Sequence, residues 1–283
     1  MSAIDKSRMK RLVTLSFVYV FLSFFALIYI YPLVWIVFNS LKGSAGEIFS
    51  NPWTPPVNPT LENYIKAWQI ANFGRLYINS IIVTSATITI LVLLVSLAGY
   101  GFSRFRFRGR DALFLIFVSG YMVPSASLVI PLYFMMKSFG LLNNLLGLIL
   151  AYVGLNIPLP LFIIRSFYNS IPVNLEEAAI IDGASPFTVF WEIVFPLLRP
   201  GIASIGIWIA LNTWNEFLYA LTFLSSPGTF TVPIGLLSFF GLYANAWGLI
   251  LAGFVIVLAP LEIIYILFQK QIVRGLTRGA IRA

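Results

Sequence analysis

The chain has 283 residues, of which 59% are hydrophobic and only 10% are charged, and its formal net charge is +8. Soluble domains are about 45–50% apolar and about 25% charged. This composition therefore excludes a soluble enzyme, a disordered chain and a fibrous protein, and it indicates an integral membrane protein.

The chain contains neither cysteine nor histidine. This excludes thiol catalysis, disulfide bonds, histidine-based acid–base chemistry and the usual zinc ligands. The sequence also lacks the Gly-x-x-x-x-Gly-Lys-[Ser/Thr] run of a P-loop, so we expect no nucleotide to bind through that motif. We therefore predict no catalytic residue, no metal site and no cofactor in this chain.

Six apolar stretches are long enough to cross a bilayer, which takes about 20 residues of helix. They cover residues 12–38, 79–102, 112–134, 145–164, 201–224 and 246–268. The first stretch is longer than the apolar core of a signal peptide, which is about 7–15 residues, so we expect it to be retained as a span. The sequence thus predicts an all-α membrane protein with six transmembrane helices.

Basic residues lie mostly on one side of these predicted spans. They occur at the N-terminus, in the loop after the second span, at the ends of the loop after the fourth span, and in the C-terminal tail. Only four of the 18 lysines and arginines fall on the other side: Lys42, Lys66, Arg75 and Lys137. Lysine and arginine favour cytoplasmic loops, so both termini are predicted to be cytoplasmic. The net charge follows from this topology, and we expect no nucleic-acid partner.

Three parts of the chain are expected from the spans. Residues 1–78 would hold the first span and an external segment, residues 79–268 a core of five spans, and residues 269–283 a cytoplasmic tail. A short helix in the external segment would place Tyr64 and Trp68 on one face, which suits a position at the membrane–water interface.

Two features of the spans and loops suit a transporter. The outer loop at residues 225–245 carries no charge, so we expect it to fold back toward the membrane or to dock onto a protein surface. Prolines interrupt most spans, and each removes a backbone hydrogen bond and favours a kink. These prolines are Pro32, Pro124, Pro131, Pro158, Pro160 and Pro260.

The longest predicted inner loop, residues 165–200, is the only inner segment with a net negative charge. Asn174 is a favourable N-cap, and Glu177 stands three residues later, as in a capping box. Gly183 occupies the place of a left-handed C-cap, and Pro186 favours the start of a second helix. We therefore predict a helix–turn–helix outside the membrane. Its first helix is too short to be stable alone, so it must dock on its own domain or on a partner.

The same loop resembles the E-A-A-x3-G-x9-I-x-L-P motif of binding-protein-dependent ABC importer permeases. The matching residues are Glu177, Ala178, Ala179, Gly183, Ile193 and Pro196, and Phe195 stands at the leucine position. Two more stretches resemble the carbohydrate branch of that family, the MalG-type permeases: residues 214–217 (Trp-Asn-Glu-Phe) and the tail at residues 271–280. The resemblance extends over essentially the whole chain.

This resemblance implies the ABC importer permease (MetI/MalG-like) fold in a bacterial or archaeal cytoplasmic (inner) membrane. It implies a non-catalytic subunit that moves a sugar, specifically an oligosaccharide, inward by ATP-driven alternating access. The implied partners are a companion permease, two ATPase subunits that bind ATP and Mg, an extracytoplasmic sugar-binding protein and the lipid bilayer.

The resemblance also implies roles for particular residues. The motif residues of the inner loop would form the coupling helix and its support at the ATPase: Glu177, Ala178, Ala179, Gly183, Ile193 and Pro196. Arg274, Gly275 and Thr277 in the tail would lie along the ATPase interface. The outer loop at residues 225–245 would reach toward the binding protein.

Two carboxylates fall within predicted spans, Glu216 and Glu262. A charge at membrane depth is costly, so each is expected to face a cavity or a partner. Glu216 stands beside Asn212, Trp214 and Asn215, and amides, a carboxylate and an indole are groups that bind sugars. The alternative is hydrogen bonding between helices. For Glu262 we expect a structural pairing with an arginine near the cytoplasmic face.

Other functions would require other sequence features. A permease of the same family for a non-sugar solute would share the inner-loop motif. A secondary transporter coupled to ions would need a proton relay or an ion site, but the chain offers no histidine and only two carboxylates in its spans. A membrane-embedded enzyme or assembly factor would need a cluster of catalytic groups, and none is present.

Overall fold

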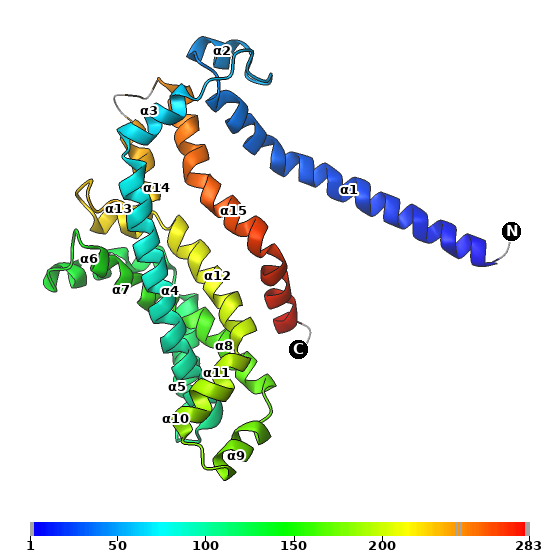
Figure 1. Ribbon diagram of the computed structural model, residues 1–283, viewed down its shortest axis with the longest axis vertical. Coiled ribbons are helices and arrows are strands. Elements are labelled where there is room, and N and C mark those ends of the chain that lie inside the picture. The colour runs from blue at the N-terminus through cyan, green and yellow to red at the C-terminus, as the bar shows by residue number, and fades with distance from the viewer. Residues whose placement is uncertain (1–2, 241–242, 244, 281–283) are drawn as a thin grey trace. The chain divides into compact units, whose positions relative to one another are not determined.

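The computed structural model describes the backbone of residues 3–240, 243 and 245–280, and the side chains of residues 12–240, 243, 245–266 and 269 (Figure 1). These described residues form helices joined by short connections, with no strand among them. The chain divides into two compact units, one of Met1–Ala71 with Ser238–Leu258 and the other of Asn72–Leu237 with Ala259–Ala283.

The first unit contains α1 (Ala3–Ser40), α2 (Ala45–Ser50), α3 (Glu62–Ile70) and the first part of α15 (Trp247–Ala280). The short helix η4 (Leu236–Phe239) lies where the chain passes from one unit to the other. The second unit contains α4 (Phe73–Arg104), α5 (Arg110–Ser119), η1 (Gly120–Met122), η2 (Ser125–Leu128), α6 (Val129–Ser138), α7 (Leu145–Asn156), α8 (Pro158–Ser170), α9 (Asn174–Ile181), α10 (Pro186–Thr188), η3 (Val189–Val194), α11 (Phe195–Leu197), α12 (Arg199–Asn215), α13 (Leu218–Phe223) and α14 (Val232–Gly235).

Three helical segments among the described residues are long and apolar enough to cross a membrane alone: Leu12–Ser40, Phe73–Arg104 and Trp247–Ile266. Three further candidates are pairs of helices bent at a short break. They are Arg110–Met122 with Ser125–Ser138, bent by 95°, Leu145–Asn156 with Pro158–Ser170, bent by 53°, and Pro186–Leu197 with Arg199–Asn215, bent by 71°. Five of the six predicted spans therefore correspond to three single helices and two bent pairs, whereas the third bent pair joins the inner-loop helix that begins at Pro186 to the start of the predicted span 201–224.

The breaks at Pro124 and Pro158 agree with the kinks expected from these prolines, whereas a break within the predicted span 201–224 was not expected. Val123 is extended (φ −79°, ψ 120°) directly before Pro124, because proline disfavours a helical residue in front of it. Pro158 has no N–H to continue α7 and instead begins α8. In the third case α12 ends at Asn215, Glu216 is extended, and residues 218–223 form the separate helix α13.

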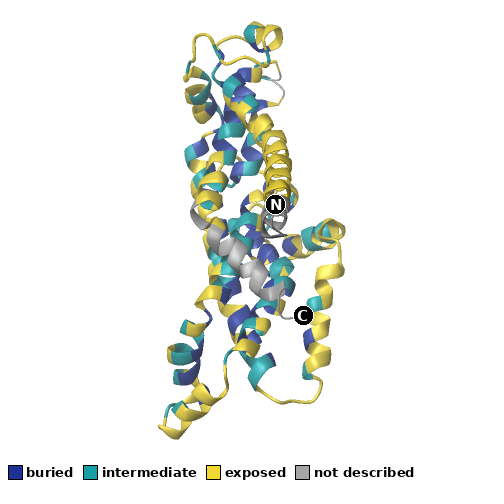
Figure 2. Cartoon of the chain, turned by 90° about the vertical axis from the view of Figure 1, so that its right-hand side faces the viewer, coloured by how far each residue is buried: buried dark blue, intermediate teal, exposed yellow. Residues whose placement is uncertain are grey.

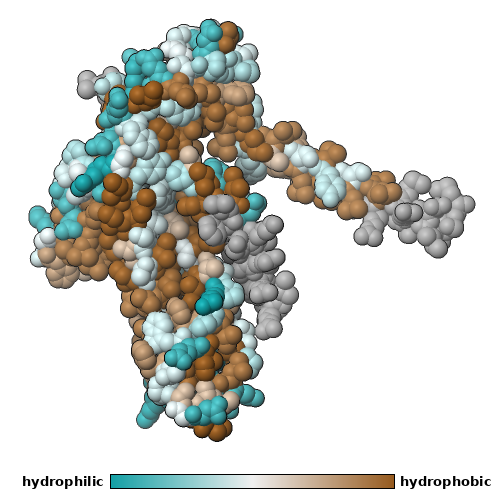
Figure 3. Space-filling view, in the orientation of Figure 1, coloured by the Kyte–Doolittle hydropathy of each residue, from teal (hydrophilic) through white to brown (hydrophobic). Residues whose placement is uncertain are grey.

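The helix α1 exposes an apolar surface over most of its described side chains. None of the residues in an apolar 18-residue stretch of this helix is buried. Over the part of α1 that is drawn in colour, Figure 2 shows the exposed residues and Figure 3 the apolar ones. An exposed apolar surface of this size requires lipid or a protein partner to cover it.

Polar side chains hold the end of α1 to α3 inside the first unit. Lys42 is buried, and its Nζ donates to Asn39 Oδ1 at 2.9 Å and to the Asn51 carbonyl at 2.6 Å. The Asn63 Nδ2 on α3 donates to the Ser40 and Lys42 carbonyls at 2.9 and 2.8 Å. Buried polar groups must find such partners, so this network fixes the start of the external segment.

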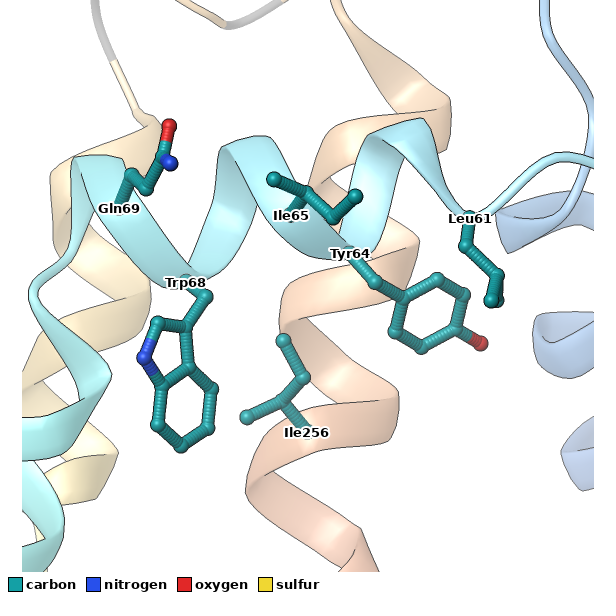
Figure 4. A pocket seen from close by; sticks show the side chains of 6 residues that line it. All are labelled: Leu61, Tyr64, Ile65, Trp68, Gln69 and Ile256. Carbon is teal, nitrogen blue, oxygen red and sulfur yellow. The ribbon is translucent and has the colours of Figure 1, made fainter.

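The helix α3 confirms the short helix expected in the external segment, and it carries an apolar pocket. The pocket has a volume of 510 Å³ and is lined by Leu61, Tyr64, Ile65, Trp68, Gln69 and Ile256 (Figure 4). On the exposed side of α3, Lys66 Nζ lies 2.6 Å from Glu62 Oε1. This hydrogen bond and the lysine charge lower the pKa of the Glu62 carboxyl.

The second unit is built around α4, which packs against α7, α8, α12 and α14. The contact with α8 is close because Gly99 has no side chain. A Cβ at position 99 would lie 2.7 Å from Ile164 Cγ2 and 3.0 Å from Tyr168 Cε2. Next to this contact, the buried Tyr168 hydroxyl donates to the Ser96 carbonyl at 2.7 Å.

Replacement of Gly99 by alanine tests this close approach. We expect Gly99→Ala to destabilise the fold by about 1–3 kcal/mol, because the added methyl group overpacks the α4–α8 contact. The matched control is Gly101→Ala on the same helix, where a Cβ meets nothing within 4 Å. The measurement is the thermal unfolding temperature of the purified protein in detergent. Equal unfolding temperatures for the two variants would contradict the close packing.

Candidate functional site

The helix–turn–helix predicted in the inner loop is present, and its first helix is α9. The start of α9 differs from the prediction by one residue. Val173 is the cap and its carbonyl accepts the Glu176 and Glu177 amides at 2.9 and 3.1 Å, whereas Asn174 is already helical and forms no capping bond. The predicted N-cap and capping box were therefore wrong. The helix start is stabilised instead by two carboxylates in its first turn, which favour the positive end of the helix dipole.

The end of α9 and the start of the next helix agree with the prediction. Gly183 has a φ of +88° and donates its amide to the Ile180 carbonyl at 3.0 Å, while the Ala184 amide donates to the Ala179 carbonyl at 2.9 Å. This pair of bonds is a Schellman motif, which needs a left-handed residue and so favours glycine. Ser185 Oγ accepts the Thr188 amide at 3.1 Å, and the second helix then runs from Pro186.

The second helix contains a π-helical turn, η3, which packs its aromatic side chains against α4. The Phe190 ring lies 5.2 Å from the Tyr100 ring of α4, and Trp191 lies 4.9 Å from both Phe190 and Phe195. The predicted site residues Ile193 and Pro196 lie in this second helix and are half-buried. They support the inner loop from within the unit and do not form its outer surface.

Glu176 ties α9 to α4 through a buried ion pair. Arg104 Nε lies 2.6 Å from Glu176 Oε1, and the side chains of Arg104 and Glu176 are 10% and 6% exposed. The Tyr100 hydroxyl donates to Glu176 Oε2 at 3.2 Å, and Arg104 Nη2 donates to the Ile171 carbonyl at 3.1 Å. Sequence analysis missed this pair because its members are 72 residues apart. The one hint of this ion pair in the sequence is that a second glutamate, Glu176, stands directly before Glu177.

The other side of α9 faces away from the unit. Glu177, Ala178 and Gly183 are exposed and Ala179 is half-buried. Large apolar side chains are exposed beside them, with Ile181 at 85% and Phe187 at 73%. The surface thus combines carboxylates with exposed apolar groups, which is typical of a surface that is covered by a protein partner.

Three of the four predicted substrate-pathway residues lie together. Asn212, Asn215 and Glu216 line an open depression of about 400 Å³ with Leu211. Asn212 Nδ2 and Asn215 Nδ2 donate to carbonyls of their own helix at 2.9 and 2.8 Å. Trp214 is buried away from this depression, with its ring 6.0 Å from the Tyr77 ring.

The Glu216 carboxylate bonds extensively within the chain. Its Oε1 accepts the Tyr219 amide at 2.9 Å, and its Oε2 accepts the Ala220 amide at 3.1 Å and the Tyr152 hydroxyl. Glu216 therefore caps the start of α13 and joins it to α7. This is the hydrogen bonding between helices that the sequence left open as an alternative to substrate contact.

The first part of the outer loop, residues 225–232, is held to the second unit from two sides. Asn143, which has a φ of +54°, accepts the Ser225 and Ser226 amides on its Oδ1, both at 3.0 Å. On α4, Asn79 Nδ2 donates to the Gly228 and Phe230 carbonyls at 3.0 and 2.8 Å. This part of the loop therefore packs on its own unit, and contact of the loop at residues 225–245 with a binding protein stays a prediction.

The remaining predicted site residues and Glu262 lie within α15. Its backbone continues as helix to Ala280, while the side chains of Arg274, Gly275 and Thr277 lie outside the described residues. Glu262 is exposed, and among the described side chains it forms no ion pair. The basic side chains of residues 270–282 lie outside that part, so its pairing with an arginine stays a prediction.

Comparison with known proteins gives an independent indication of the family. The profile described as "Binding-protein-dependent transport system inner membrane component" matches residues 95–278. The chain is 37% identical over 278 residues to a probable ABC transporter permease of Bacillus subtilis, covering 98% of this chain and 92% of that protein. It is 36% identical to the trehalose/maltose transport system permease of Thermococcus litoralis, covering 91% and 93%, and 33% identical to the permease of a diacetylchitobiose uptake system of Streptomyces coelicolor, covering 91% and 85%.

A solved structure shares the fold. A bacterial ABC transporter involved in the import of the acidic polysaccharide alginate contains a chain that superposes with a TM-score of 0.81 at 24% identity, covering 95% of this chain and 98% of that one. The predicted all-α permease fold and the resemblance to carbohydrate permeases are therefore confirmed.

Substitution of Glu216 tests its capping role. Glu216→Gln keeps the shape but places an amide group among three donors, so we expect a loss of about 1–3 kcal/mol of stability. The matched control is Glu262→Gln, whose carboxylate is exposed. Thermal unfolding of both variants in detergent is the measurement. A Glu216→Gln protein as stable as the control would show that the carboxylate is not needed for the α12–α13 junction.

Proposed function

The chain belongs to the family of binding-protein-dependent transport system inner membrane components, and from this membership we propose that it is the permease subunit of an ABC importer for a carbohydrate. The observation that carries the proposal is the outward surface of α9, where Glu177, Ala178 and Ile181 are exposed. A two-turn helix with such a surface is not stable alone in water. It suits docking into a cleft of an ATPase subunit.

The proposed assembly contains two ATPase subunits, which bind ATP and Mg, and a companion permease. The exposed apolar length of α1 supports a permease partner in the membrane in addition to lipid. The tail residues Arg274, Gly275 and Thr277 would extend the ATPase interface. The assembly would lie in the cytoplasmic membrane of a bacterium or archaeon, with a sugar-binding protein outside that contacts the outer loop.

In this assembly ATP acts by shifting a conformational equilibrium. Closure of the two ATPase subunits would displace the docked α9, and the spans packed on it would then switch the central cavity between inward-open and outward-open states. ATP and the loaded binding protein would shift this equilibrium, because each binds one of the two states more tightly than the other. No covalent step passes through this chain, and its own residues dock, transmit movement and line the path.

An oligosaccharide is the proposed substrate. The names of two relatives, the trehalose/maltose and diacetylchitobiose permeases, point to sugars of this kind. In this chain, the depression with Asn212, Asn215 and Glu216 offers amide groups and a fixed carboxylate edge. Such groups bind sugar hydroxyls. The buried Trp214 would not contact the sugar, and it would instead stabilise the helix that carries Asn212 and Asn215.

Reversal of the charge on α9 tests ATPase docking. We expect Glu177→Lys to insert normally, to lose transport and to retain much less ATPase during purification, since a mismatched charge at an interface costs several kcal/mol. The measurement is ATPase co-purification from mild detergent together with sugar uptake in cells.

The matched control for this test is Glu192→Lys, an exposed acid of the same inner segment on η3. It should behave as the unmodified protein. Normal uptake and normal ATPase recovery with Glu177→Lys would contradict the docking role of α9.

Removal of the exposed amides tests the substrate path. Asn212→Ala and Asn215→Ala should each raise the KM for sugar uptake by up to about tenfold, because each removes a neutral hydrogen bond worth about 0.5–1.5 kcal/mol. Thr222→Ala is the control, since its hydroxyl bonds only within its own helix. Uptake of mono- and oligosaccharides and of amino acids and peptides would be compared. Transport of a non-sugar solute alone would contradict the carbohydrate assignment.

A further inference from the structure

We infer that α4 carries movement between α9 and the outer loop at residues 225–232, with Arg104–Glu176 as its inner attachment and Asn79 as its outer attachment. This inference rests on the proposed docking of α9 on an ATPase. It adds a route inside this chain by which nucleotide at one face changes the structure at the other. Figure 1 shows α9 beside one end of α4 and α14, which follows the loop, near the other end.

The inner attachment to α4 is a specific ion pair, in addition to the packing of Ala179 and of α9 on η3. Glu176 is the one buried residue of α9, and the large apolar side chains of that helix are exposed. Arg104 holds both Glu176 and the carbonyl of Ile171, which lies just before α9. A displacement of α9 therefore acts on α4 through the Arg104 side chain, because separating the pair would leave two charges unpaired in a buried position.

The outer attachment is made by one face of the first two turns of α4. Asn79 is 2% exposed and donates to two loop carbonyls, of Gly228 and Phe230. Ser80 Oγ, one residue later, accepts the Val232 amide at 2.8 Å. Arg75 Nε donates to the Gly228 carbonyl at 3.1 Å. These bonds fix the backbone of the loop, so a shift of α4 must move the loop with it.

Between these two attachments α4 is continuous. It has 32 residues without a proline, which corresponds to a rod of about 48 Å at 1.5 Å per residue. The three broken helix pairs of the described chain are bent by 53° to 95° and can absorb a displacement by bending at their breaks. An unbroken helix transmits displacement along its axis, and α4 also contacts α7, α8, α12 and α14.

The connection must act in both directions. If nucleotide at the ATPase changes the outer loop, then a protein bound to that loop changes nucleotide affinity by the same factor. The outer loop would thereby report the arrival of a loaded binding protein to the ATPase. If the movement passed instead through the bent helices, substitution of Asn79 or Glu176 would not reduce the nucleotide-dependent change in the outer loop.

The absence of cysteine from the chain allows a direct test. Pro227→Cys places one thiol at an exposed position of the outer loop, and the complex is purified with cysteine-free ATPase subunits and a cysteine-free companion permease and reconstituted in lipid nanodiscs. The measurement is the rate of maleimide reaction at residue 227 with and without ATP and vanadate. In the otherwise unmodified complex we expect the rate to change about fivefold or more, the lower end of ordinary coupling.

Variants at each end of α4 then distinguish a loss of transmitted movement from a loss of complex assembly. Glu176→Gln and Asn79→Leu should each reduce the nucleotide-dependent change to less than half, while ATPase subunits still co-purify and still hydrolyse ATP. Arg104→Lys keeps the charge pair and should retain most of the change. The matched controls are Glu192→Gln on the inner segment and Ser85→Ala on α4, whose hydroxyl bonds only within the helix. Both should respond as the parent.

The outcomes are distinguishable. A full nucleotide response in both Glu176→Gln and Asn79→Leu overturns the role of α4. If Glu176→Gln fails to assemble, Asn79→Leu at the opposite end decides the question, and a full response in it overturns the inference. Failure of the parent protein to recover any ATPase would instead overturn the proposed function from which the inference starts.

Discussion

The buried ion pair between Arg104 and Glu176 is the constraint on which the inner half of the second unit depends. Two charges with side chains 10% and 6% exposed are tolerated only because each also has a neutral partner, the Ile171 carbonyl and the Tyr100 hydroxyl. Loss of one member of such a pair costs about 3–5 kcal/mol. This pair leaves the apolar side chains of α9 free to face outward, where a partner can cover them.

The broken spans follow a related rule, that each break exposes backbone groups which the chain must pair again. Between α5 and α6 the Tyr219 hydroxyl donates to the Ser125 carbonyl at 2.6 Å. In the last turn of α7 before Pro158, Asn156 Nδ2 adds a bond to the Tyr152 carbonyl at 2.8 Å. After α12, Glu216 accepts the first free amides of α13. Tyr152 and Tyr219 each contribute to more than one of these junctions, so the breaks support one another.

Local signals predicted local structure well and distant contacts poorly. Gly183 and Pro186 marked their turn because left-handed caps and helix starts depend on the residue itself. The Asn174 cap was wrong because the Val173 carbonyl already accepts the first amides of α9. The end of α12 at Asn215 could not be predicted, because the apolar stretch in the sequence continues to residue 224. The motif identified the inner loop, but Arg104 could not be matched to Glu176, since no local pattern specifies a partner 72 residues away.

Glu216 differs in role from the two asparagines that line the same depression, Asn212 and Asn215. Both of its carboxylate oxygens accept bonds from α7 or α13, so its charge already stabilises a helix junction. Asn212 and Asn215 are exposed on the last turn of α12 and use their Nδ2 groups within that helix. Their amide oxygens are then the groups best placed to accept from a neutral hydroxyl. Under the proposed function, a path with neutral contacts and a fixed carboxylate would bind a sugar weakly enough to release it, as transport requires, and tight recognition would be left to the proposed sugar-binding protein.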